Sequence, residues 1–511
     1  MNVIIRILLF LLIGFFLNVG PVLSQLLPEQ VVNAVAIMPG DTPEMIVKKA
    51  AHVRPSERQT VWQELEFTVF IHFGINTFTG REWGTRNEDP SNFNPSELDA
   101  RQWAATAQMA GAKLLVMVAK HHDGFCLWPS EFTEFSVVKS PWKDGKGDVI
   151  GEVATACREA GIKLGIYLSP WDLNSPLYGT DKYNEYFKNQ LRELLTQYGE
   201  VSEVWFDGAC GEGPNGIRQV YDWKGYYEIV RELQPGAVVA VKGPDVRWVG
   251  TETGFGRETE WSVIPVSEEI INEIALSTQD SPAGYIFPAM ADQMEPDLGS
   301  REKIMNAAGM IWYPSEVDVS IRPGWFYHAE EDPLVKSPQQ LMEIYLSSVG
   351  RNAVLLLNIP PDRRGLIPEN DVKSLAGFSK IKDSIFAVNL ALGISPEPVP
   401  HQKNDRLQTL TDGDPLTYWS PDENTACSVT LDLGTERRFT LLQLQENYRN
   451  GQRVEEFTLE ALIGQEWQEI ARGTSIGYKR IIKFNETNAR KIRLNILSSR
   501  DNPEISGIGI Y

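Results

Sequence analysis

Residues 114–125 read LLVMVAKHHDGF, an unbroken apolar run that ends in a lysine, two histidines and an aspartate. In a strand with one solvent-exposed face, apolar and polar residues alternate. A parallel strand that is buried on both faces is apolar along its whole length. The stretch Leu114–Lys120 is therefore typical of a buried parallel strand. The polar residues that follow it stand at the carboxyl end of this strand. In parallel α/β folds, functional residues lie at the carboxyl ends of the strands.

Similar apolar runs lie on either side of this stretch, and amphipathic segments separate them. The expected strands are Phe67–Phe73, Lys163–Leu168, Val201–Phe206 and Val238–Lys242. The expected helices are Asp99–Ala110, Asp148–Ala160, Lys182–Tyr198 and Tyr221–Leu233, and helix stop signals follow three of them at Gly161, Gly199 and Gly236. This alternation of strands and helices predicts a parallel sheet.

The later strands are less regular. Ile311–Val319 and Ala353–Asn358 are the better candidates and Trp261–Val266 the weaker one, with Pro338–Val349 as the helix before the last strand. The number of strands fits a closed (β/α)8-like barrel better than an open doubly wound sheet. A dinucleotide-binding sheet would carry a glycine-rich phosphate loop after its first strand, and none stands there. We therefore predict an α/β fold built on a barrel.

The pattern changes near residue 375. A helical stretch, Asp371–Leu390, leads into the segment ISPEPVP at 394–400, and short alternating strands fill the rest of the chain. Short strands at regular spacing predict an all-β sandwich. The predicted organisation is a signal peptide over 1–24, the barrel over 25–375, a helical and Pro-rich linker over 376–400 and the sandwich over 401–511.

The N-terminus has the layout of a secretory signal peptide, with Arg6 before an apolar run, Ile7–Leu17, and small or polar residues up to Gln25. We expect cleavage near Ser24 and a secreted or periplasmic protein; a membrane anchor is the alternative. No later segment has about 18 uninterrupted apolar residues, so we expect no other membrane span. The four cysteines lack CxxC spacing, which disfavours a zinc cluster or a disulfide scaffold: Cys126, Cys157, Cys210 and Cys427.

Charge narrows the class of partner. The 511 residues include 48 basic and 68 acidic side chains, a formal charge of −20. Binding to a phosphate backbone requires clustered lysine and arginine, so a nucleic-acid partner is disfavoured. A neutral substrate such as a sugar fits better, and the 14 tryptophans and 16 tyrosines supply faces that pack against sugar C–H groups.

Polar residues stand at the ends of the expected strands. Three of the six histidines are found there, His72 after the first strand and His121 and His122 after the second. Asp207 ends the fourth apolar run and Gly208 follows it. An acid at that end of a barrel strand lies at the floor of the pocket, which makes Asp207 the candidate nucleophile. The alternative is an aspartate that only caps a turn.

A retaining glycosidase pairs its nucleophile with a second carboxyl roughly 5 to 5.5 Å away, which serves as acid and base. Residues 247–263, RWVGTETGFGRETEWSV, offer Glu252, Glu258 and Glu260. Glycines flank Glu252, as in a loop that closes over a leaving group. Glu258 is the second choice, because the neighbouring Arg257 indicates a local ion pair.

Several strings carry a family resemblance: FIHFGINTFTGREWG, AKHHDGFCLWPS, YLSPWD, VWFDGA and SIRPGWFYH. Together they resemble the α-L-fucosidases of glycoside hydrolase family 29 over about residues 60 to 375. The loop VGTETG is similar to that of the subgroup acting on α-1,3/1,4-fucosyl branches, although Thr251 and Thr253 depart from its pattern. The resemblance implies a retaining exo-α-L-fucosidase with Asp207 as nucleophile and Glu252 as acid/base, acting on Lewis-type glycans.

The resemblance also implies roles in substrate binding. His72, His121 and His122 would bind fucose hydroxyls, and Glu82 and Trp83 would meet the hydroxyls and the ring face. Three further tryptophans would complete the sugar site: Trp171, Trp205 beside the nucleophile, and Trp325 against the C5 methyl group. No metal or other cofactor is expected in catalysis.

The C-terminal string LTDGDPLTYWSPDENTACSVTLDLG resembles discoidin-like, galactose-binding-type domains of the carbohydrate-binding kind. Asp412 and Asp414, with nearby carbonyl groups, are candidate ligands of a structural Ca²⁺; an acidic turn without an ion is the alternative. The sequence does not decide whether this domain binds sugar or only braces the barrel.

Other functions remain open at this stage. A fucosidase of broad specificity, or another retaining barrel glycosidase such as an α-galactosidase, would use a similar site. Metal-dependent hydrolysis through His72, His121, His122 and Asp207 would be sensitive to EDTA. A glycan-binding protein without catalysis would keep the aromatic residues but would not need the acid at Asp207.

Overall fold

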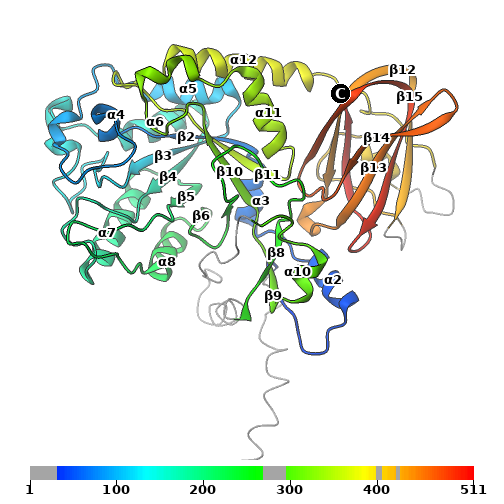
Figure 1. Cartoon of the computed structure of the whole chain (residues 1–511), viewed down its shortest axis with the longest axis horizontal. Helices are drawn as coiled ribbons and strands as arrows, with labels where there is room; N and C mark the ends of the chain where they lie inside the picture. Colours follow the sequence, from blue (N-terminus) through cyan, green and yellow to red (C-terminus); the bar gives the residue numbers. More distant parts are fainter. Residues whose placement is uncertain (1–31, 269–294, 399–405, 422–425) are drawn as a thin grey trace, which may run out of the picture.

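The computed structural model describes residues 32–268, 295–398, 406–421 and 426–511, so the expected signal peptide lies outside the described residues. Eight strands, all parallel, form one sheet in the order β6-β5-β4-β3-β2-β11-β10-β7 (Figure 1). Their bounds are β2 Phe67–Ile71, β3 Leu114–Lys120, β4 Lys163–Leu168, β5 Glu203–Phe206, β6 Val238–Val241, β7 Arg247–Trp248, β10 Ser315–Ser320 and β11 Ala353–Asn358. A single bridge between Ala240 and Val246 nearly closes this sheet, which confirms the predicted barrel.

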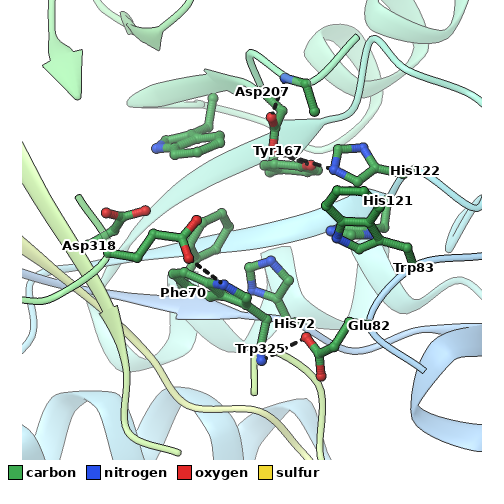
Figure 2. A pocket seen from close by; sticks show the side chains of 13 residues that line it. Phe70, His72, Glu82, Trp83, His121, His122, Tyr167, Asp207, Asp318 and Trp325 are labelled. Carbon is green, nitrogen blue, oxygen red and sulfur yellow. Dashed lines mark hydrogen bonds and ion pairs between the residues drawn. The ribbon is translucent and has the colours of Figure 1, made fainter. Parts of the chain in front are cut away.

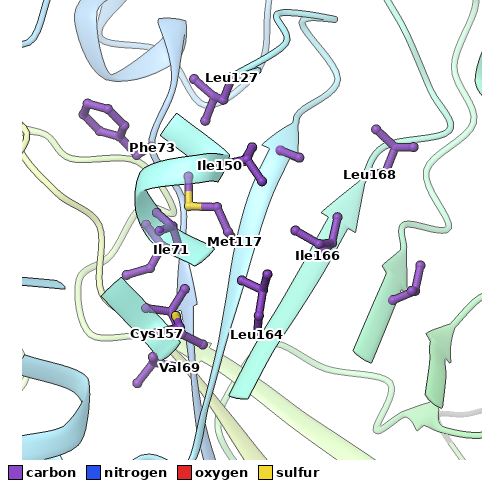
Figure 3. Packing of buried hydrophobic residues seen from close by; sticks show 14 of the residues in the cluster. Val69, Ile71, Phe73, Met117, Leu127, Ile150, Cys157, Leu164, Ile166 and Leu168 are labelled. Carbon is purple, nitrogen blue, oxygen red and sulfur yellow. The ribbon is translucent and has the colours of Figure 1, made fainter. Parts of the chain in front are cut away.

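Helices cover the outside of the barrel: α5 Ala100–Ala110, α6 Val149–Ala160, α7 Lys182–Gln197, α8 Trp223–Leu233, α11 Pro338–Ser348 and α12 Glu369–Ile385. Two short helices flank β2, α3 Glu57–Gln63 before it and α4 Ile75–Thr79 after it, and Trp62 of α3 packs in the barrel interior. Alternate residues of each strand face the two sides of the sheet. In β3, Val116 packs into the barrel interior, whereas Met117 packs outward against the helix layer. Figure 3 shows this outer layer, in which Ile150 of α6 lies over the strands. Burial on both faces explains why most of these strands are apolar throughout, as β2 and β3 are.

The barrel is irregular between β6 and β10. The five residues between β6 and β7 form no helix, and a separate three-stranded antiparallel sheet with the order β1-β9-β8 follows. It consists of β1 Ala34–Ala36, β8 Val263–Val266 and β9 Gly309–Trp312, beside the helices α2 Pro43–Ala51 and α10 Arg301–Met305. The expected single strand Ile311–Val319 is therefore wrong. It divides at Tyr313-Pro314, where proline provides no N–H for a ladder and the chain passes from β9 into β10.

The C-terminal domain is an antiparallel sheet of five strands in the order β14-β13-β15-β12-β16. Their bounds are β12 Cys427–Glu446, β13 Val454–Ile463, β14 Glu466–Gly473, β15 Arg480–Ser499 and β16 Ile505–Ile510. The long strands β12 and β15 are interrupted by register shifts, so the sheet bends around a core of its own that includes Leu431, Leu444 and Leu494. Polar and apolar residues alternate along β12, as expected of a sheet with one face exposed.

Helix α12 ties the two domains together (Figure 1). It packs against α5 and α11, and its Phe378 is buried in the core of the barrel. The predicted boundary between residues 375 and 376 thus falls inside a helix of the barrel. A second connection between the domains lies at Glu66, directly before β2. Its carboxylate accepts hydrogen bonds from Tyr478 and Lys479 of the C-terminal domain, both at 2.6 Å. Among the described residues, no helix has the length and apolar character needed to span a membrane.

Candidate active site

A pocket with a cavity volume of about 170 Å³ opens at the carboxyl ends of the barrel strands (Figure 2). Nine of the residues predicted from the sequence line it: His72, Glu82, Trp83, His121, His122, Trp205, Asp207, Glu252 and Trp325. They come from loops after β2, β3, β5, β7 and β10, so residues far apart in the sequence converge on one cavity.

Asp207 directly follows β5, and its side chain is 24% exposed toward the pocket. The Tyr167 hydroxyl donates to its Oδ2 at 3.0 Å and the Ala209 amide donates to its Oδ1 at 2.7 Å. His122 Nε2 lies 3.7 Å from Oδ2. These contacts fix the orientation of the carboxylate while its open side faces the cavity, an arrangement suited to a nucleophile.

The histidines present acceptor atoms to the pocket. His72 Nδ1 lies 2.9 Å from Asn358 Oδ1, which also accepts from the His72 amide, so Nδ1 carries the proton. Ser169 Oγ gives its hydrogen to the Trp171 carbonyl, so His122 Nδ1 must donate to Ser169 at 2.7 Å. Each ring keeps the lone pair of Nε2 available for a hydroxyl donor, such as that of a sugar.

Burial keeps these rings neutral. It lowers the pKa of His72 to about 3, and it lowers the pKa of His121 well below the ordinary value of a histidine. The pKa of His122 is lowered by burial as well, although the nearby Asp207 opposes the shift. The site therefore offers uncharged imidazoles over the whole neutral range of pH.

Buried pairing holds the two histidines after β3 in place. Lys120 Nζ lies 3.1 Å from Asp172 Oδ2 and 2.9 Å from Gln190 Oε1 in the core beneath them. A register shift between Val118 and Lys120 lets His121 and His122 both reach the pocket, although neighbouring strand residues normally face opposite sides. Among the described residues, no group of three or more histidine, cysteine or acidic side chains could hold a metal ion.

Glu82 joins two walls of the pocket. Its carboxylate accepts from the Trp325 amide at 2.9 Å and from the Phe326 amide at 3.4 Å, and it lies 2.7 Å from His328 Nε2. The Trp325 indole in turn donates to Glu252 Oε2 at 3.2 Å. Glu82 thus positions the loop after β10, and that loop holds the side chain of Glu252.

The three glutamates of the loop after β7 have different environments. Glu252 is exposed and lines the pocket. Glu258 points away and forms ion pairs with Arg351 and with Arg480 of the C-terminal domain. Glu260 is buried and pairs with Arg247 and Arg257. Of the three, Glu252 alone is among the residues that line the pocket.

Trp171 occupies a different place from the one expected. It lies behind two of the residues that line the pocket. Its ring centroid is 5.0 Å from that of His122 and 5.4 Å from that of Trp83. Four lining residues were missed from the sequence: Phe70, Tyr167, Ala209 and Asp318. The sequence does contain an indication of Asp318. Glu316 and Asp318 are charged residues at alternate positions of a strand that is buried throughout.

Two other expectations concern positions outside this pocket. Asp412 Oδ1 accepts from the Asp414 amide at 2.8 Å and its Oδ2 from the Thr417 hydroxyl at 2.7 Å, so the turn is stabilised by its own hydrogen bonds. Asp414 Oδ1 caps the Leu416 amide at 2.9 Å in the same way. The calcium site stays a prediction. All four cysteines are free thiols.

Comparisons with known proteins agree with this geometry. The sequence matches the family model for alpha-L-fucosidase over residues 40–381 and that for the F5/8 type C domain over residues 397–509, which confirms the discoidin-like prediction. It is 41% identical to alpha-L-fucosidase 1 of Arabidopsis thaliana over 467 residues, 89% of this chain and 87% of that protein.

Solved structures are similar over both domains. A Ruminococcus gnavus GH29 fucosidase in complex with fucose matches with a TM-score of 0.78 at 29% identity, over 94% of this chain and 97% of the other. A Bacteroides ovatus protein, provisionally assigned as an α-L-fucosidase, matches with a TM-score of 0.82 at 48% identity, over 94% and 77% of the two chains. Because the family model spans the barrel that carries the pocket, and the Arabidopsis relative aligns along most of both chains, this chain belongs to the α-L-fucosidases of glycoside hydrolase family 29 and is a glycoside hydrolase acting on fucosylated glycans.

Proposed function

We propose that the enzyme removes terminal L-fucose with retention of configuration, with Asp207 as nucleophile and Glu252 as acid/base. The observation that carries this proposal is the pair itself. Asp207 follows β5 and Glu252 follows β7, and both carboxylates line one pocket together with neutral histidines. The other two glutamates of this loop, Glu258 and Glu260, form ion pairs with arginines.

In the first step, an oxygen of Asp207 attacks the anomeric carbon while Glu252 gives its proton to the departing oxygen. Tyr167 and Ala209 orient the attacking carboxylate. In the second step, Glu252 takes a proton from water, the water attacks the anomeric carbon, and the bond to Asp207 breaks. The Trp325 indole holds Glu252 between the two steps.

We propose a preference for α-1,3/1,4-linked fucose on branched, Lewis-type glycans. Support comes from the VGTETG loop, in which Gly250 and Gly254 have φ values of +103° and +83°. Both lie in the left-handed region that favours glycine, so these two positions define where the loop turns toward and away from the pocket. A branching sugar that contacts this loop would use its binding energy to place Glu252.

Asp207→Asn tests the proposed nucleophile. We expect the folded variant to lose several orders of magnitude of kcat, because no covalent intermediate can form. NMR of the wild-type reaction should show the α anomer of fucose first. Near-normal turnover by Asp207→Asn, or β-fucose as the first product, would contradict the mechanism. Equal rates on a Lewis-type trisaccharide and on 2'-fucosyllactose would indicate a fucosidase of broad specificity instead.

A further inference from the structure

Asp318 is a fourth acid on the wall of the pocket. It lies near the carboxyl end of β10, is 3% exposed and lines the cavity close to Trp325 (Figure 2). The Trp248 indole donates to its Oδ1 at 2.8 Å. Asp318 has no role in the two steps proposed for Asp207 and Glu252.

The charged groups around Asp318 are all acids. Glu252 and Asp207 face it across the pocket, and Glu316 precedes it by two residues on the same side of β10. Glu316 in turn faces Glu203 of β5 in the barrel interior. Within the described part of the chain, no lysine or arginine forms an ion pair with Asp318. Burial and the neighbouring carboxylates raise the pKa of Asp318 to about 8.

A neutral Asp318 would add a hydrogen-bond donor to a wall that is rich in acceptors. Sugar hydroxyls both donate and accept, and the wall offers them its carboxylates and the Nε2 atoms of His72 and His122 as acceptors. Three of its donors are already engaged, as the Tyr167 hydroxyl donates to Asp207, the Trp325 indole to Glu252 and the Trp205 indole to Glu316. Among the described residues, the Trp83 indole N–H on the opposite part of the wall has no acceptor. A protonated carboxyl at position 318 is a donor that no protein acceptor uses.

We propose that Asp318 is a substrate-binding residue that works as a neutral acid, donating its O–H to an oxygen of the bound fucose. This inference rests on the proposed function only in placing fucose in this pocket. The carboxyl is held by Trp248 so that one oxygen is fixed and the other is free for the ligand. Its neutrality also keeps a further negative charge away from Asp207 and Glu252.

The test is the affinity for L-fucose, measured by calorimetry at pH 6 and pH 9. For wild type we expect affinity to fall about tenfold, because one pH unit above the pKa leaves roughly a tenth of Asp318 protonated. Asp318→Asn keeps a neutral donor and the acceptor for Trp248, so its affinity should be the same at both pH values. Asp318→Ala should bind several-fold more weakly than wild type at pH 6 and show no fall.

Neighbouring groups need a control. The histidines of the pocket stay neutral throughout this range, because burial lowers their pKa values. Glu316→Gln removes the nearest buried carboxyl without touching the cavity, and it should retain a fall in affinity. If Asp318→Asn showed the wild-type fall, or Asp318→Ala bound as well as wild type at pH 6, the proposal would be overturned. Because L-fucose is a product, either outcome would leave the roles of Asp207 and Glu252 to their own tests.

Discussion

The loop after β7 consists of two halves with opposite properties. In residues 249–254, Glu252 and Thr253 are exposed, and the Glu252 carboxylate has one hydrogen-bond donor, Trp325. Residues 256–262 are held from several sides. The Gly256 amide donates to the Ser347 carbonyl at 2.7 Å, Arg351 donates to the Gly256 carbonyl at 2.9 Å, and Glu260 is buried.

The C-terminal domain supplies much of this anchoring. Gln452 donates to the Glu260 carbonyl at 3.0 Å and accepts from the Ser262 amide at 2.8 Å. Ser475 and Arg480 add hydrogen bonds to the Glu260 and Glu258 carbonyls at 3.0 and 2.7 Å. One loop thus carries an exposed acid next to a segment that the C-terminal domain helps to fix.

Replacing Glu252 should give the largest effect and separates the two halves most clearly. Glu252→Ala should slow cleavage of a Lewis-type trisaccharide by about 10²–10⁴-fold, because a sugar leaving group needs a proton. A nitrophenyl fucoside needs little protonation, so its first step should be much less affected. Added azide should partly rescue the variant by attacking the fucosyl-enzyme in place of activated water. Steady-state kinetics on both substrates measure the difference.

Glu258→Ala is the matched control from the anchored half. Its side chain is 71% exposed, and an exposed ion pair contributes about 1 kcal/mol or less. Both substrates should therefore be cleaved at nearly wild-type rates. A defect in Glu258→Ala that depended on the leaving group would move the acid/base role to Glu258.

Breaking the buried ion pair in residues 256–262 should destabilise the protein. Glu260→Ala leaves Arg247 buried without its carboxylate, and such a loss costs about 3–5 kcal/mol. Denaturant unfolding should show this loss in Glu260→Ala, with Glu258→Ala close to wild type. A stability equal to that of wild type would mean that the pair does not brace the loop.

The sequence predicted the barrel because buried parallel strands are apolar throughout, and it predicted most of the pocket because polar residues such as His72 and Asp207 end those strands. The positions of the two glutamates in the sequence do not show that Glu252 lines the pocket whereas Glu258 pairs with arginines. That difference depends on Arg480, which lies more than two hundred residues away and meets the loop only in the folded chain. The division of 311–319 at Pro314 was missed because both halves are strands, and the proline that separates them was not taken as a boundary.

The most direct test of coupling between the two halves should come from Arg480, where we expect a small effect. Its side chain is 7% exposed and donates to the Glu258 carbonyl at 2.7 Å, but it does not reach the pocket. Arg480→Met should loosen residues 256–262 and so leave Glu252 less well placed, at a cost of about 1 kcal/mol, or roughly fivefold, in kcat on the branched trisaccharide.

The first step on the nitrophenyl fucoside, measured as kcat/KM, should show no such loss, because nitrophenol leaves without a proton from Glu252. Arg480→Lys retains a donor and a positive charge and should recover part of the rate. A general loss of structure would lower both substrates together and would not be repaired selectively by lysine. If Arg480→Met left the trisaccharide rate unchanged, the C-terminal domain would stabilise the loop without positioning the acid, and the two halves would be independent.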